Sequence, residues 1–165
     1  MINESNLNKC YSKIANKLNE IIPVEWKKVA MYAEEFGDVS RAIFYFYTQD
    51  KDGNLIPHNS GYLQDEYNVS EEEWDSSFDE LYRVNKELWL EFEKAGEKTW
   101  DILIFKLDSN GKFKIKFEYD TDRNIDFFTK EIIWAYEDLG IVPQDNYSMS
   151  TLEDYLKSKG EELKK

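Results

Sequence analysis

Apolar side chains recur at every third or fourth position in three long segments of the chain, and this spacing predicts three amphipathic helices. The first helix is expected to end before Pro23, the second to run from Ser70 to Gly96, and the third to end at Gly140. The predicted buried faces are Leu7, Tyr11, Ile14, Leu18 and Ile21 in the first helix, Trp74, Phe78, Leu81, Leu88 and Phe92 in the second, and Ile125, Phe128, Ile132, Ala135, Tyr136 and Leu139 in the third.

Aromatic and β-branched residues dominate four further runs, which we expect to be the strands 26–33, 41–48, 100–107 and 113–119. Phe36-Gly37-Asp38 separates the first two runs and Asn110-Gly111 separates the last two, so each pair predicts a β-hairpin. In the last run, apolar residues alternate with lysines. This alternation is typical of a strand with one buried face and one solvated face.

The order of these elements predicts an α+β fold, in which an antiparallel sheet of two hairpins packs against helices. A chain of 165 residues is long enough for one well-buried core and too short for two, so we expect a single domain over residues 1–165. Its core is expected to cover about residues 7–143. A short last helix is expected over residues 151–162, opened by Ser150 and Glu153 as a capping box.

The composition of the chain argues against a membrane protein and against a zinc site. No apolar run approaches the roughly 20 residues needed to cross a bilayer, and the stretch from Met1 to Lys9 is polar, so we expect a cytoplasmic protein without membrane contact. The single cysteine, Cys10, is expected to be a small buried hydrophobe. The single histidine, His58, is expected in a solvated loop, and no Cys/His pattern of zinc spacing exists.

The most informative feature is an acidic segment from Asp65 to Glu80, which carries eight carboxylates and no Lys or Arg in a chain of net charge -13. A surface of this sign repels nucleic acid and attracts proteins that bind nucleic acid. The segment also contains Tyr67, Trp74 and Phe78, so we expect the charge to lie on a folded scaffold. A purely structural explanation stays open for its first-turn carboxylates, because they suit the positive end of a helix dipole.

Catalytic motifs are scarce in the sequence. We find no Gly-rich phosphate loop, no nucleophile elbow and no second histidine, so the chain is not expected to be an enzyme or to need a cofactor or metal. The segment 50–54 is expected to form a turn because it fails the calcium-loop pattern. The alternative is a metal-dependent hydrolase that uses the carboxylates Glu118, Asp120, Asp122 and Asp126, although such residues before a helix are usually turn formers and caps.

Three stretches, taken together, resemble the YezG/EsaG-type antitoxin family of Gram-positive bacteria. Residues 14–26 end in an Ile-Pro-x-Glu-Trp pattern, residues 113–120 end in Lys-Phe-Glu-Tyr-Asp, and residues 134–143 match an aromatic-x-Tyr-x-x-x-Gly-Ile-x-Pro segment. The resemblance runs from about Leu7 to Pro143 in consistent order and includes Glu66-Tyr67-Asn68. The chain departs from the family at residues 120–124, where an aromatic-rich segment is expected.

The resemblance implies a cytoplasmic immunity protein that binds and silences the nuclease domain of a toxin exported by the type VII secretion system. It implies no catalytic residues. An export adaptor or chaperone for a secreted partner is a further alternative. Charge and expected exposure, rather than the family, select the candidate contacts with the toxin: Asp65, Glu66, Tyr67, Glu72, Asp75 and Asp79 in a first patch, and Asp120, Asp122 and Asp126 in a second.

Overall fold

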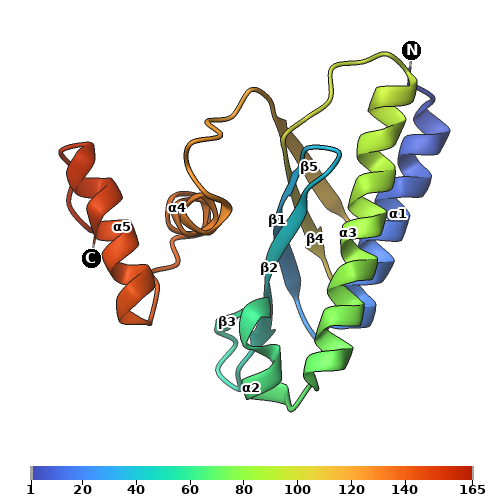
Figure 1. Ribbon diagram of the computed structural model, residues 1–165. Helices are drawn as coiled ribbons and strands as arrows, with labels where there is room; N and C mark the ends of the chain where they lie inside the picture. The colour runs from blue at the N-terminus through green and yellow to red at the C-terminus, as the bar shows by residue number, and fades with distance from the viewer. Residues whose placement is uncertain (1, 165) are drawn as a thin grey trace. The chain divides into compact units, whose positions relative to one another are not determined.

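The computed structural model describes residues 2–164, which form two compact units that meet in sequence between Thr121 and Asp122. The first unit is a five-stranded antiparallel sheet with helices packed against it, so the predicted α+β architecture is confirmed (Figure 1). Its elements are α1 (Glu4–Ile21), β1 (Lys28–Glu35), β2 (Ser40–Gln49), β3 (Leu55–Asn59), η1 (Ser60–Tyr62), α2 (Leu63–Tyr67), α3 (Glu71–Lys94), β4 (Ile102–Asp108) and β5 (Phe113–Glu118). The second unit contains α4 (Phe127–Leu139) and α5 (Asn146–Ser158).

The sheet follows the order β3-β2-β1-β4-β5, so the two predicted hairpins join through their first strands. Met31 of β1 lies opposite Phe44 of β2 on one side and opposite Phe105 of β4 on the other. All three side chains are buried on the face that carries the main core. Because side chains alternate along a strand, this register fixes which residues of every strand face the helices.

Helices α1 and α3 lie side by side, antiparallel, against one face of the sheet (Figure 1). Salt bridges join Lys13 to Glu87 at 2.9 Å and Lys17 to Glu80 at 2.6 Å along the seam between the helices. Between helices and sheet, the rings of Phe44 and Phe78 stack with centroids 5.7 Å apart. Cys10 is buried in the same core, which confirms its predicted role as a small hydrophobe.

Helix α3 begins and ends as its sequence predicts. The hydroxyl of Ser70 accepts a hydrogen bond from the Glu73 amide at 3.1 Å, and the helix stops just before Gly96, whose φ of +70° suits glycine. The predicted apolar face is confirmed, since four of its members are buried and the fifth, Trp74, is partly buried against the core. The buried members are Phe78, Leu81, Leu88 and Phe92.

Strand β3 corrects the prediction that this part of the chain is a loop. Its residues pair with β2, so that His58 lies opposite Phe46 and Pro57 lies opposite Tyr47. Proline is compatible with a strand here because β3 is the outermost strand of the sheet. His58 is therefore not a solvated loop residue: its side chain is only 18% exposed and its ring stacks on Phe46, with centroids 5.0 Å apart.

In the second unit, the structure also corrects the predicted start and end of the last helix. Helix α5 spans Asn146–Ser158 instead of residues 151–162, because Asp145 caps it by accepting a hydrogen bond from the Ser148 amide at 2.8 Å. Ser150 lies inside the helix and is not its cap. Helix α4 packs against α5 through Ile132, Leu152 and Leu156, but Phe128, which the pattern placed on the buried face, is 39% exposed.

None of the helices among residues 2–164 has the length and apolar character that crossing a lipid bilayer requires.

Gly37, in the turn between β1 and β2, should be sensitive to any side chain. Its φ is +93°, and an added Cβ would lie 3.0 Å from the Trp89 ring of α3. We expect Gly37→Ala to lower the free energy of unfolding in urea by about 2–3 kcal/mol, the sum of backbone strain and steric conflict. Gly111→Ala is the matched control, because Gly111 has a φ of +88° but nothing within 4 Å of the added atom. Equal losses in the two variants would contradict the predicted conflict with Trp89.

Glu131 of α4 should make stability depend on pH. Burial, followed by the charge of Asp145, raises the pKa of this carboxyl to about 8. Between its ordinary pKa of 4.5 and about 8, the folded chain holds a proton that the unfolded chain releases, so the free energy of unfolding falls as pH rises through this window. Glu131→Gln should therefore gain more than about 1 kcal/mol over the wild type at pH 8 and little at pH 4.

Denaturant melts at the two pH values measure this difference, with the exposed Glu137→Gln on the same helix as control. A gain for Glu131→Gln that is the same at pH 4 and pH 8 would show that the buried carboxyl does not titrate as described.

Candidate functional site

The fold divides the acidic segment into carboxylates that have partners inside the molecule and carboxylates that face solvent alone. Glu66 lies 3.1 Å from Nδ1 of His58, and Glu80 forms its salt bridge with Lys17, which lowers the pKa of Glu80. Among the described residues, no ion pair or side-chain hydrogen bond engages the remaining carboxylates of the segment, all of which are exposed. These are Asp65, Glu71, Glu72, Glu73, Asp75 and Asp79.

Glu72, Asp75 and Asp79 form what we call the acidic flank of α3. Their positions fall on one side of the helix at 100° per residue, on the flank and opposite side from the buried face that packs on the sheet. Tyr82 borders the flank one turn further on, and its pKa is raised by burial and then by the charges of Asp79 and Asp75, while Arg41 opposes the shift. Asp75 and Asp79 therefore act together on a partly buried tyrosine ring.

Helix α2 presents Asp65, Glu66 and Tyr67 next to the amino end of α3. It is tied to the sheet by His58, whose Nε2 lies 2.8 Å from the Thr48 hydroxyl and whose Nδ1 faces both Glu66 and, at 3.4 Å, the Tyr67 hydroxyl. The Tyr67 ring packs on Phe46, and burial raises the pKa of Tyr67, with a smaller contribution from Glu66. Of the first predicted patch, Tyr67 is thus largely structural, while Asp65 is exposed.

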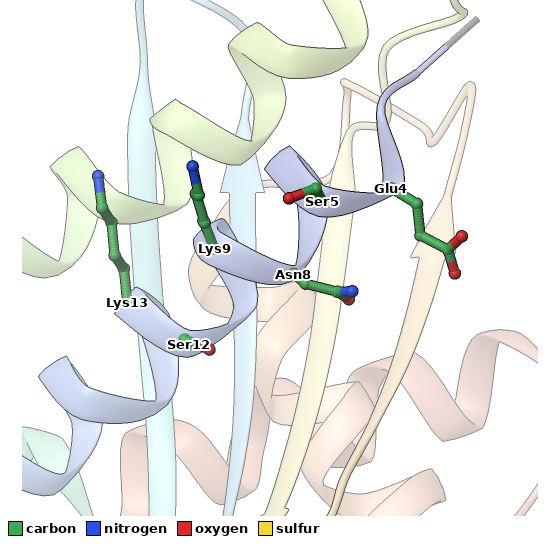
Figure 2. A pocket seen from close by; sticks show the side chains of 6 residues that line it. All are labelled: Glu4, Ser5, Asn8, Lys9, Ser12 and Lys13. Atoms are coloured by element: carbon green, nitrogen blue, oxygen red, sulfur yellow. The ribbon is translucent and has the colours of Figure 1, made fainter.

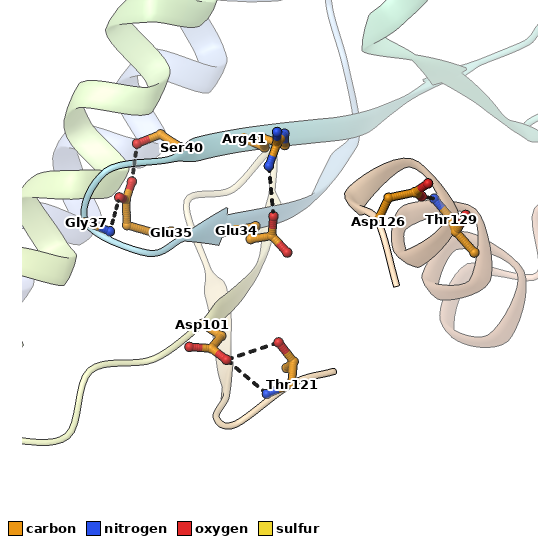
Figure 3. Close-up of polar contacts among 9 residues, drawn as sticks. All are labelled: Glu34, Glu35, Gly37, Ser40, Arg41, Asp101, Thr121, Asp126 and Thr129. Carbon is orange, nitrogen blue, oxygen red and sulfur yellow. Dashed lines mark hydrogen bonds and ion pairs between the residues drawn. The ribbon is translucent and has the colours of Figure 1, made fainter. Parts of the chain in front are cut away.

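The second predicted patch is not one surface within either compact unit, because Asp120 belongs to the first unit and Asp122 and Asp126 to the second. Asp120 forms an ion pair with Lys98, and Asp122 accepts a hydrogen bond from the Asn124 amide at 2.9 Å. Asp126 caps α4 by accepting from the Thr129 amide at 2.8 Å, and these bonds to Thr129 lower the pKa of Asp126 (Figure 3). All three stay exposed, so each combines a structural contact with surface charge.

Other carboxylates are held inside the first unit and leave no charge on its surface. Glu35 accepts hydrogen bonds from the Gly37 amide at 2.8 Å and from the Ser40 hydroxyl, which closes the turn of the first hairpin (Figure 3). Asp101 accepts from both the amide and the hydroxyl of Thr121, at 2.9 and 3.1 Å. These residues support the fold, and they are not candidates for partner contact.

The carboxylates of the rival hydrolase also have structural contacts. Glu118 lies 3.7 Å from Lys116, and the other three are the residues of the second patch described above. Within residues 2–164, no three His, Cys, Asp or Glu side chains come together in a way that could hold a metal ion.

A shallow hollow lies on the outer side of α1, and every residue that lines it belongs to that helix (Figure 2). Lys9 and Lys13 project on one side of it and Glu4 and Asn8 on another, so no reactive groups converge. A second depression lies between α1 and α3 and is lined by lysines and glutamates, including the Lys13–Glu87 pair. Burial raises the pKa of the Cys10 thiol at its base, which disfavours the reactive thiolate.

Sequence reasoning missed an exposed aromatic pair in the second unit. Phe128 was assigned to the core, and Tyr147 was not singled out, yet Tyr147 is 73% exposed and the two ring centroids lie 5.5 Å apart. A signal was present in the sequence: Asp126 and Asp145 each precede an aromatic residue by two positions, as in a helix cap followed by its second helical residue.

The His58 network should control the local stability of α2. In His58→Phe the ring can still stack on Phe46, but the contacts with Thr48 and Glu66 are lost. We expect a loss of about 1–2 kcal/mol in the free energy of unfolding and faster amide hydrogen exchange in residues 63–67. Thr48→Val is the matched control, since it removes only the hydroxyl partner. Unchanged exchange in α2 of His58→Phe would show that His58 does not hold this helix.

Comparison with known proteins now identifies the family. A sequence model of the family described as "Immunity protein YezG-like" matches residues 7–153. The chain is 37% identical over 150 residues to Immunity protein YezG of Bacillus spizizenii, covering 90% of this chain and 91% of that protein. It is 32% identical to Immunity protein YezG of Bacillus subtilis, covering 88% and 96%, and 29% identical to Type VII secretion system protein EsaG of Staphylococcus aureus, covering 93% and 96%. The chain belongs to the YezG-like immunity protein family, as its motifs predicted.

Proposed function

We propose that this member of the YezG-like immunity protein family binds and neutralises a nuclease toxin in the cytoplasm of the cell that produces it, and that it catalyses no reaction. The immunity role of the family implies a toxin as partner. The name of the Staphylococcus aureus relative supports a toxin exported by type VII secretion. Because the family match spans residues 7–153, it includes parts of both compact units, and we propose that they act as one immunity domain.

The acidic flank of α3 is the observation that carries the nuclease proposal. Glu72, Asp75 and Asp79 are exposed, carry no internal ion pair among the described residues, and lie in a protein of net charge -13. A nuclease must present a basic cleft to hold the phosphate backbone of its substrate. Carboxylates on a rigid helix complement such a cleft and compete with phosphate for the same cations.

The charge and the rings would contribute to different steps of binding. A field of this sign raises the rate of association with a basic partner by about 10- to 1000-fold at low salt. The lifetime of a complex depends instead on a few well-packed contacts, often aromatic. Tyr82, partly buried beside the flank, provides such a ring without a further cost in ordering a flexible side chain.

The test of this function uses the cognate nuclease toxin, which we expect to be encoded next to the gene for this chain. Its nuclease domain is incubated with nucleic acid in the absence and presence of the purified protein, and co-expression measures protection of a host cell. We expect one equivalent of the protein to abolish cleavage and to restore growth. Full cleavage at excess protein, or turnover of a small substrate by the protein itself, would contradict the proposal.

Charge reversal on the acidic flank should slow association. For Asp75→Lys/Asp79→Lys, we expect the association rate constant with the toxin to fall about tenfold or more at 20 mM salt, and to approach the wild-type value at 500 mM. Stopped-flow measurements with labelled nuclease domain provide the rates.

The matched control for this variant is Glu93→Lys/Glu97→Lys, which changes the net charge by the same amount. Both residues are exposed; Glu93 lies 18 positions beyond Asp75 in α3, about 27 Å away by the helical rise, and Glu97 follows just after the end of the helix. An equal decrease in both variants would indicate that only net charge matters, and no decrease in either would remove the acidic flank from the interface.

A further inference from the structure

The most exposed large apolar side chain among the described residues has no role in the core. Tyr147, at the start of α5, is 73% exposed, and within residues 2–164 its one ring contact is with Phe128 at the start of α4. The centroids are 5.5 Å apart and the planes are tilted by 37°. The core between α4 and α5 is made by other residues, Ile132, Leu152 and Leu156. We call Phe128 and Tyr147 the aromatic pair.

The aromatic pair is held in place by two equivalent helix starts. Asp126 accepts from the Thr129 amide and Asp145 from the Ser148 amide, both at 2.8 Å, and an aromatic residue follows each aspartate by two positions. The Tyr147 carbonyl also accepts a hydrogen bond from the Thr151 hydroxyl at 3.1 Å, one turn into α5. Both rings are therefore carried by ordered helical backbone, although solvent reaches much of their surface.

Exposed rings on ordered backbone are unfavourable for a protein that has no use for them. Tyrosine and phenylalanine bury large area when a partner covers them, and tyrosine is enriched among the residues that dominate binding energy. Substitution of Tyr147 should change the free energy of unfolding very little, because most of its surface is already in contact with water. Its exposure is therefore better explained by a partner than by stability.

We propose that the aromatic pair is the docking point for an arginine side chain of the toxin, whose guanidinium stacks on the ring of Tyr147 while the carboxylate of Asp126 supplies the opposite charge. The inference rests on the proposed function and adds a second contact, on the second compact unit, to the acidic flank of the first. Arginine is selected because its planar cation stacks on aromatic faces and pairs with carboxylates.

An exposed aromatic pair could also bind nucleic acid or a second copy of this chain, and the charges around the rings disfavour both of these partners. Nucleic acid would stack on the rings, but its phosphates would meet Asp126 and Asp122, which are exposed carboxylates on the same unit. A second copy of this chain would bring the same carboxylates against each other. A basic toxin surface is the occupant whose charge agrees with the residues around the rings.

The test measures equilibrium binding of the full chain to the inactivated nuclease domain of the toxin encoded beside its gene. Truncation of an interface hot spot costs a factor of about ten or more in affinity, so we expect that loss for Tyr147→Ala and for Phe128→Ala. Tyr147→Phe keeps the ring and should bind as the wild type does. Tyr147→Leu keeps apolar bulk without a ring, and it should lose as much affinity as Tyr147→Ala.

Asp126→Asn tests the charge without disturbing the fold, because asparagine caps a helix as well as aspartate does. We expect a loss of about three- to tenfold in affinity at low salt that shrinks as salt is added. Thermal melts of all variants serve as the control and should match the wild type, apart from a small decrease for Phe128→Ala.

Each outcome is decisive. Wild-type affinity in Tyr147→Ala, or retained affinity in Tyr147→Leu, would overturn the inference while the proposed function stands. Failure of the wild type to bind the nuclease domain would overturn both. A dimer of the free chain in sedimentation equilibrium that Tyr147→Ala converts to a monomer would assign the aromatic pair to self-association, and tighter binding of single-stranded DNA by the wild type than by Tyr147→Ala would assign it to nucleic acid.

Discussion

The burial of one face of α3 is the constraint on which the rest of the first unit depends. Phe78, Leu81 and Leu88 are fully buried between α1 and the sheet, and each such side chain contributes about 1.5–3 kcal/mol. A helix fixed along this face cannot rotate about its axis. The neighbouring flank, with Glu72, Asp75 and Asp79, is therefore held toward solvent at a defined angle, and the same packing that stabilises the fold also orients the charge.

Repulsion among these carboxylates opposes folding, and local contacts within the first unit reduce this unfavourable free energy. Ser70 caps α3, and carboxylates in its first turn interact favourably with the helix dipole. Glu80, which faces α1, is neutralised by Lys17, and Glu66 is engaged by His58. Among the described residues, the carboxylates of the acidic segment that have no partner are all exposed to solvent. Selective pairing of this kind leaves a preorganised acidic surface, which loses little entropy when it meets a basic partner.

Much of the fold could be predicted from the sequence because its signals are local. The apolar periodicity of α1 and α3 and the Asn110-Gly111 turn each act within a few residues, and the structure confirms them.

The errors arise where tertiary contacts determine the local structure. Residues 55–59 form β3 because β2 offers a free edge, and His58 is drawn in by Phe46, Thr48 and Glu66. Periodicity likewise placed Phe128 in the core because no sequence pattern reports where α5 lies. Charge singled out the carboxylates of the acidic flank, but only the structure separates them from Glu80, whose partner is 63 residues away.

We propose that an acidic surface of this chain occupies the basic cleft where a nuclease holds its substrate. The most direct measurement is competition between this protein and labelled DNA or RNA for the inactivated nuclease domain of the toxin encoded beside its gene. We expect one equivalent of the protein to displace the nucleic acid completely, with no ternary complex formed. A stable complex of toxin, nucleic acid and this protein would contradict it.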